Sequence, residues 1–160
     1  MVLQNSLDAL GRSGVVLFPS DTVLGLSCDA TNQAAVDTIF SIKNRPQSKS
    51  LIALVADMEM LTTYVETIPE SVHEILKGNR SPTTIVYPKA KGIAPMAMAE
   101  DGSMAFRIPK SGFALDLVKS FGKPIIATSA NLSGEPIPEN ESQVDRRILE
   151  QVDYVVPLKS

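Results

Sequence analysis

The strongest constraint on the fold is the stretch 123–134, where an apolar run stops abruptly at small hydroxyl and amide side chains. Ile125 and Ile126 have the branched, apolar character of a strand that is buried on both faces. The residues that follow are small, so a ligand could approach the backbone closely. Because ligands of open α/β sheets bind beyond the carboxyl ends of strands, Ser129 and Asn131 are predicted to lie at a binding site. The alternative is a capped turn, in which Ser, Asn and Gly are equally common.

Apolar residues at helical spacing alternate with short apolar runs along the rest of the chain. The expected helices span 3–12, 32–42, 58–64, 69–77, 113–121 and 143–152, and the expected strands, besides the one at 125–126, span 15–18, 24–28, 51–56, 83–87, 103–108 and 153–156. The longest apolar run, 51–56, is the best candidate for a central strand. Alternation in 83–87 and 103–108 indicates that these two strands pair antiparallel.

These elements predict an α/β (α+β) fold, a twisted mixed parallel and antiparallel sheet flanked by helices. With 160 residues, the chain can build one complete hydrophobic core and is too short for two domains of ordinary size. We therefore expect a single domain over 1–160.

Cysteine and histidine chemistry is limited, because Cys28 and His73 are the only residues of their types. They provide neither a disulfide framework nor a Cys/His zinc cluster. His73 is expected on the polar face of an amphipathic helix, and Cys28 as a small buried hydrophobe. Asp21 and Asp29 could each touch a metal, but their spacing does not require one, so the metal ligands stay unknown.

The charge and hydropathy patterns restrict partners and compartment. A formal net charge of −3 argues against a protein that coats nucleic acid, although a local basic cleft is compatible with it. No apolar run reaches the roughly 18 residues that span a bilayer, and the N-terminus lacks a basic region followed by an apolar one. We expect no membrane partner and a cytoplasmic protein.

Three cations, Lys43, Arg45 and Lys49, fall within seven residues after the second expected helix. Cations near a helix C-terminus are favoured by the helix dipole, which is the simplest explanation of the cluster. Lys49, however, lies beyond Pro46 and outside any helix. The cluster is therefore also interpreted as a polyphosphate clamp, in which Arg supplies forked donors and Lys a point charge.

Arg107 interrupts an otherwise apolar strand, between Phe106 and Ile108. A strand arginine between two apolar residues normally needs an anionic partner. The alternative is an outward-facing arginine on a half-exposed strand.

Five segments resemble, in order, the motifs of one family. They are Phe-Pro-Ser-Asp-Thr-Val-Leu-Gly-Leu at 18–26, Ile-Lys-Asn-Arg-Pro with Lys-Ser-Leu at 42–51, Pro-Thr-Thr at 82–84, Ala-Phe-Arg-Ile-Pro at 105–109 and Pro-Ile-Ile-Ala-Thr-Ser-Ala-Asn-Leu-Ser-Gly at 124–134. The chain resembles the YrdC family of L-threonylcarbamoyladenylate synthases over nearly all of 14–156. The resemblance implies a short, single-domain, YrdC-like member.

The resemblance implies a nucleotidyltransferase that converts ATP, L-threonine and bicarbonate into threonylcarbamoyl-AMP and pyrophosphate, with Mg²⁺ accompanying ATP. Downstream proteins then transfer the threonylcarbamoyl group to adenosine 37 of tRNA. The resemblance also makes tRNA or double-stranded RNA a candidate partner. The alternative is a YrdC-like paralogue that binds RNA or a nucleotide without catalysis. A carbamoyl-transfer domain of a hydrogenase-maturation protein is a more remote reading.

The resemblance also assigns candidate site residues. It implies that Thr22, Arg107 and Ala127 border the threonine pocket. ATP contacts are implied for Arg45, Lys49, Ser103 and Ser129, with Lys43 and Asn131 in the same motifs. Threonine carbamate is itself a nucleophile for the α-phosphorus, so the enzyme needs positioning and charge neutralisation rather than a covalent intermediate. We therefore assign Lys43 and Arg45 the catalytic part, neutralising the triphosphate, and Arg107 the threonine carboxylate.

Overall fold

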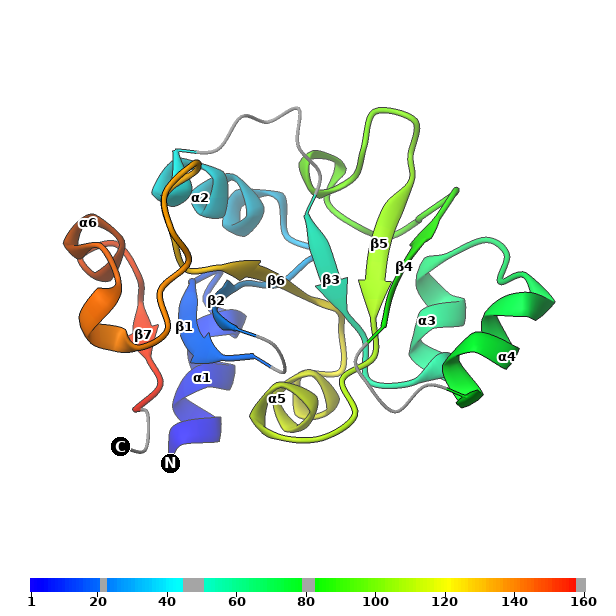
Figure 1. The fold of residues 1–160 in the computed structure, drawn as a ribbon, viewed down its shortest axis with the longest axis horizontal. Helices are drawn as coiled ribbons and strands as arrows, with labels where there is room; N and C mark the ends of the chain where they lie inside the picture. Colours follow the sequence, from blue (N-terminus) through cyan, green and yellow to red (C-terminus); the bar gives the residue numbers. More distant parts are fainter. Residues whose placement is uncertain (21–22, 45–50, 79–82, 158–160) are drawn as a thin grey trace.

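The computed structural model describes residues 1–20, 23–44, 51–78 and 83–157, which build a single seven-stranded mixed sheet with helices on both faces (Figure 1). The strand order is β4-β5-β3-β6-β2-β1-β7. The strands are β1 (Val16–Pro19), β2 (Leu24–Ser27), β3 (Ile52–Leu54), β4 (Thr84–Tyr87), β5 (Met104–Arg107), β6 (Ile125–Ser129) and β7 (Tyr154–Val155). The predicted fold class is confirmed.

The α-helices within the described ranges are α1 (Val2–Gly11), α2 (Gln33–Lys43), α3 (Met58–Tyr64), α4 (Glu70–Gly78), α5 (Phe113–Phe121) and α6 (Arg146–Leu149). Local sequence explains where α2 and α5 end. Asn32 caps α2 by accepting a hydrogen bond from the Ala35 N–H, and Asn44 closes it in the left-handed region. Gly122 closes α5 at φ 77°. None of the helices described is both long and apolar enough to cross a membrane.

Strand pairing is mixed, as expected. β4 and β5 pair antiparallel, which confirms the prediction from their alternation. β3 runs parallel to β5 and antiparallel to β6. β3 is paired on both sides, which confirms the prediction that 51–56 contains a central strand, although the middle position of the seven belongs to β6. An apolar run reports burial on both faces, which β3 and β6 share, and does not encode the order of strands.

The two faces of the sheet belong to two apolar clusters, and residues alternate between them along each strand. On one face Ala53, Phe106 and Ile126 pack with α2, α3 and α6. On the other face Leu54 and Ile125 pack with α1 and α5. In Figure 1, α3 and α4 lie together at the end of the sheet formed by β4. On the second face, α1 contacts β1 and β7, and α5 contacts β1.

The predicted final helix over 143–152 is wrong in extent. The chain forms a 3₁₀ turn at Glu141–Gln143, an extended residue at Val144, and then only the single turn of α6. Asp145 interrupts the helical pattern because its carboxylate caps α6, accepting a hydrogen bond from the Arg147 N–H. The carboxylate also pairs with the Arg147 guanidinium at 2.8 Å, and these hydrogen bonds lower the pKa of Asp145 to about 2.

Candidate functional site

The end of β6 is tied to the last turn of α2 through the side chain of Lys43. This lysine is only 1% exposed. Its ammonium donates to the backbone carbonyl of Ser129, lies 3.2 Å from Oδ1 of Asn131 and reaches Oγ of Ser129 at 3.5 Å. The structure thus brings Lys43 together with Ser129 and Asn131, two other predicted site residues that lie 86 and 88 positions further along the chain.

The turn after β6 is held by further hydrogen bonds, so its small side chains have fixed positions. Oγ of Ser129 donates to Oδ1 of Asn131 at 2.5 Å, and Nδ2 of Asn131 donates to the carbonyl of Glu135 at 2.7 Å. The Ser133 N–H donates to the carbonyl of Lys43 at 2.8 Å. The predicted binding turn is therefore preorganised and held by the buried ammonium of Lys43. The positive charge of this ammonium favours an anion at the surface of the turn.

Arg107, at the end of β5, is buried with 7% exposure. It lies directly between Leu54 of β3 and Thr84 of β4 in the sheet register. Nη1 of Arg107 donates to Oγ1 of Thr84 at 3.3 Å, and the backbone carbonyl of Arg107 accepts from the Val55 N–H at 3.0 Å. The open alternative of an outward-facing, solvated arginine is therefore wrong, because the side chain is buried and hydrogen-bonded.

Arg107 and Ala127 lie on the same face of the sheet, the face that carries Leu54 and Ile125. The register continues this face across β3, where Ile52 pairs with Ala127 on one side and with Ala105 on the other. Two strand spacings, about 10 Å, separate β5 from β6.

The strand register places Thr84, Arg107, Ala105, Ile52 and Ala127 beside one another on this face, and we call this row of residues the open strip. Thr84 is exposed, and Ala105 and Ile52 are half-buried. Neighbouring positions under α1 and α5, such as Phe18 and Ile125, are fully buried. The helices therefore cover Ile52, Ala105 and Thr84 less completely than they cover Phe18 and Ile125, while Arg107 and Ala127 are each 7% exposed.

Ser103 precedes β5 at the edge of the sheet where β6 ends. Ala105 and Ala127 both pair with Ile52, from opposite sides of β3. Ser103 lies two residues before Ala105, and Ser129 lies two residues after Ala127 on the antiparallel strand, so both serines lie at the same edge. The hydroxyl and N–H of Ser103 both donate to the Asp101 carboxylate, at 2.6 and 2.9 Å. These hydrogen bonds lower the pKa of Asp101.

Three of the predicted site residues, Thr22, Arg45 and Lys49, lie outside the described residues. The proposed polyphosphate clamp is therefore represented in the structure only by Lys43. Ser20 and Asn44, the described residues that immediately precede the two undescribed segments, belong to the same two motifs.

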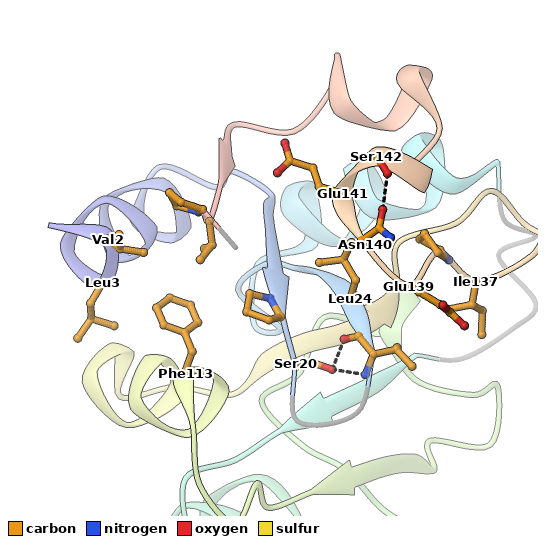
Figure 2. Close-up of a pocket in the computed structure, with 15 residues that line it drawn as sticks. Val2, Leu3, Ser20, Leu24, Phe113, Ile137, Glu139, Asn140, Glu141 and Ser142 are labelled. Carbon is orange, nitrogen blue, oxygen red and sulfur yellow. Dashed lines mark hydrogen bonds between the residues drawn. The ribbon is translucent and has the colours of Figure 1, made fainter. Parts of the chain in front are cut away.

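A large open cavity lies between the end of β1, the start of β2, the starts of α1 and α5, and the segment 137–142 (Figure 2). Its volume is about 1390 Å³, and its lining includes Leu3, Leu24, Phe113 and Ile137. None of the predicted site residues that the structure describes lines it, and Thr22, which lies outside the described residues, falls in sequence between the lining residues Ser20 and Val23. The described predicted residues form two hydrogen-bonded groups, Lys43 with Ser129 and Asn131 at the β6 turn, and Arg107 with Thr84 across β4 and β5.

A metal site built from the protein alone does not occur among the described residues, where no group of three or more His, Cys, Asp or Glu side chains converges. Asp29 is 5% exposed and its carboxylate already accepts from Thr31 and Lys123.

Sequence reasoning missed three residues of the open strip, Thr84, Ala105 and Ile52. Two of them could have been found. Thr84 belongs to the Pro-Thr-Thr motif and shares one face of its alternating strand with the apolar Val86, which indicates a polar position on that face. Ala105 precedes Arg107 by two and so shares its face. Ile52 required the strand register, which only the structure provides.

Comparison with known proteins gives a consistent result. The family model Sua5_yciO_yrdC, described as telomere recombination, matches residues 8–159. Threonylcarbamoyl-AMP synthase of Vibrio cholerae is 32% identical over 99% of this chain and 86% of its own length. The synthase of Stenotrophomonas maltophilia is 29% identical over 98% and 86%. The crystal structure of P. abyssi Sua5 complexed with L-threonine superposes with a TM-score of 0.89 at 30% identity, covering 96% of this chain and 45% of that one.

Proposed function

The chain belongs to the Sua5–YciO–YrdC family, and from that premise we propose that it is a threonylcarbamoyl-AMP synthase. The proposed reaction consumes ATP, L-threonine and bicarbonate and releases threonylcarbamoyl-AMP and pyrophosphate. The observation that carries the proposal is that relatives named for this activity align with nearly the whole chain, together with the similarity to a structure that binds L-threonine.

The geometry suits a reaction that proceeds by positioning. The carbamate oxygen of threonine carbamate attacks the α-phosphorus, and the bond from that phosphorus to the bridging oxygen breaks to release pyrophosphate. No step needs a protein nucleophile or a titrating histidine. His73 is exposed on α4 and Cys28 is fully buried, in agreement with this chemistry and with their sequence predictions.

We assign the threonine carboxylate to Arg107 at one end of the open strip, with Ala127 at the other end. A guanidinium suits a carboxylate because it offers several donors in one plane. Ala105 and Ile52 form an apolar floor between them, against which a small side chain would pack. Thr22 stays part of this proposal by the family resemblance.

The nucleotide is assigned to the turn after β6. Ser129 and Asn131 are half-buried and fixed in place, and Ser103 lies at the same sheet edge. Arg45 and Lys49 keep their proposed role in neutralising the triphosphate. Because the Lys43 ammonium is already bonded to the β6 turn, its contribution is a buried positive charge that also holds the turn in place.

Mg²⁺ is proposed to enter with ATP, carried mainly by the phosphate oxygens. When bound, it would neutralise the charge that develops on the phosphates. Transfer of the threonylcarbamoyl group to adenosine 37 of tRNA by partner proteins, and direct binding of tRNA or double-stranded RNA, are also proposals that rest on the family alone.

A pyrophosphate-release assay tests the function. The synthase predicts release that requires threonine and bicarbonate together, and no release when either is omitted. The non-catalytic alternative predicts RNA binding with steep salt dependence and no turnover under any of these conditions. The names of the aligned relatives favour the synthase over that alternative.

A further inference from the structure

Thr84 and Arg107 face each other across the antiparallel pair β4–β5, and Nη1 of Arg107 donates to Oγ1 of Thr84 at 3.3 Å. Arg107 is 7% exposed, whereas Thr84 is exposed. Building on the proposed function, we infer that Thr84 is a positioning residue for the amino-acid carboxylate. It holds the Arg107 guanidinium in the orientation that binds the carboxylate, and it acts through Arg107 rather than on the reacting atoms.

A threonine hydroxyl is suited to this task. An arginine side chain has many rotamers, and fixing them before the substrate arrives lowers the entropic cost of binding. A hydroxyl accepts a hydrogen bond without carrying a charge, so it orients the guanidinium without cancelling the charge that attracts a carboxylate. The branched side chain of threonine also has few rotamers in a strand, which fixes the position of the acceptor.

The position on β4 is specific to Thr84. Val86, two residues further along, lies on the same face of the strand, is 65% exposed and has no hydrogen-bonding group. Tyr87 is 2% exposed and packs edge-on against Phe106 on the opposite face. Of the four residues of β4, only Thr84 therefore presents a polar side chain next to Arg107.

The inference predicts a defined kinetic change. Thr84→Val keeps the shape of the side chain and removes the acceptor, so the KM for threonine should rise about three- to tenfold, the range for losing one hydrogen bond that positions a charged group. The kcat and the KM for ATP should change little. Thr84→Ser keeps the hydroxyl and should restore most of the affinity for threonine.

A double-mutant cycle with Arg107 separates this role from general loss of structure. In an Arg107→Ala background, Thr84→Val should cause no further rise in the KM for threonine, because the group that it orients is gone. Val86→Thr is the matched control, since it changes polarity on the same face of β4 without contacting Arg107. Its KM values should match those of the unmodified protein.

The experiment measures pyrophosphate release against threonine concentration, and L-threonine binding by calorimetry, for all of these proteins. An unchanged KM and unchanged binding in Thr84→Val, or equal penalties with and without Arg107, would overturn the role of Thr84 and leave the proposed function intact. If the unmodified protein binds threonine but releases no pyrophosphate, the synthase proposal fails and the binding data still test Thr84. If it does not bind threonine, both are overturned.

Discussion

Asp29 and Lys123 form an ion pair of 3.0 Å that connects the end of β2 to the start of β6. Asp29 is 5% exposed and also accepts from the N–H and hydroxyl of Thr31, at 2.9 and 2.6 Å. Ile125, two residues after Lys123, forms an isolated bridge with Asp29. The pair therefore fixes the beginning of the strand whose other end carries the candidate site.

Replacing Asp29 should destabilise the protein more than replacing Lys123. We expect Asp29→Ala to lower the free energy of unfolding by about 1–3 kcal/mol, because the N–H and hydroxyl of the half-buried Thr31 and the Lys123 ammonium lose their charged acceptor. Lys123→Met should cost about 1 kcal/mol or less, since the lysine side chain is 46% exposed. Urea unfolding curves of both variants check this order, and equal losses would contradict it.

Ser27 presents the opposite situation. Its hydroxyl is buried and finds no hydrogen-bond partner among the described residues. Ser27→Ala should therefore raise the free energy of unfolding by about 1 kcal/mol, because an unsatisfied polar group is removed. Ser6 is equally buried but donates to the Val2 carbonyl at 2.9 Å, so Ser6→Ala is the control and should lower stability. A loss of stability in both variants would show that the Ser27 hydroxyl is satisfied.

Lys43→Met tests whether the β6 turn depends on the buried ammonium. It should abolish most threonine-dependent pyrophosphate release and lower the free energy of unfolding by about 1–3 kcal/mol, because the Ser129 carbonyl and Asn131 Oδ1 lose their donor. Lys119→Met, at an exposed position of α5, should change neither quantity. Normal activity and stability in Lys43→Met would exclude the role assigned to it.

Cys28 should be chemically silent in the folded protein. Burial, with a smaller contribution from the charge of Asp29, raises the pKa of its thiol, so that the reactive thiolate is scarce at neutral and mildly alkaline pH. We expect iodoacetamide to label the protein quickly in urea and very slowly in buffer at pH 8. Mass spectrometry of the intact protein reads out both rates, and comparable rates would mean that Cys28 is accessible.

The sequence was sufficient to predict those parts of the fold that local patterns encode. Ile125 and Ile126 are fully buried in β6, as their branched, apolar character indicated. The cap at Asn32 and the pairing of β4 with β5 followed from residue type and alternation. Motif spacing likewise placed Ser129 and Asn131 at the end of a strand.

What the sequence could not provide depends on contacts between distant segments. Three cations close together in sequence do not reveal that Lys43 turns inward to the Ser129 carbonyl, because that direction is set by packing of α2 against β6. The open strip likewise depends on register across three strands, which makes Ile52 a neighbour of both Ala105 and Ala127. Side-chain alternation gives the face of a residue but not its neighbours across the sheet.

The most direct test of the central claim is mass spectrometry of a mixture of the protein with ATP, Mg²⁺, L-threonine and bicarbonate. We predict a threonylcarbamoyl-AMP ion that is absent when threonine is omitted. Arg107→Ala should form it far more slowly at low threonine, since losing a hydrogen bond to a charged group costs about 1.5–3 kcal/mol. No such ion from the unmodified protein, or an equal yield from Arg107→Ala at low threonine, would contradict the account.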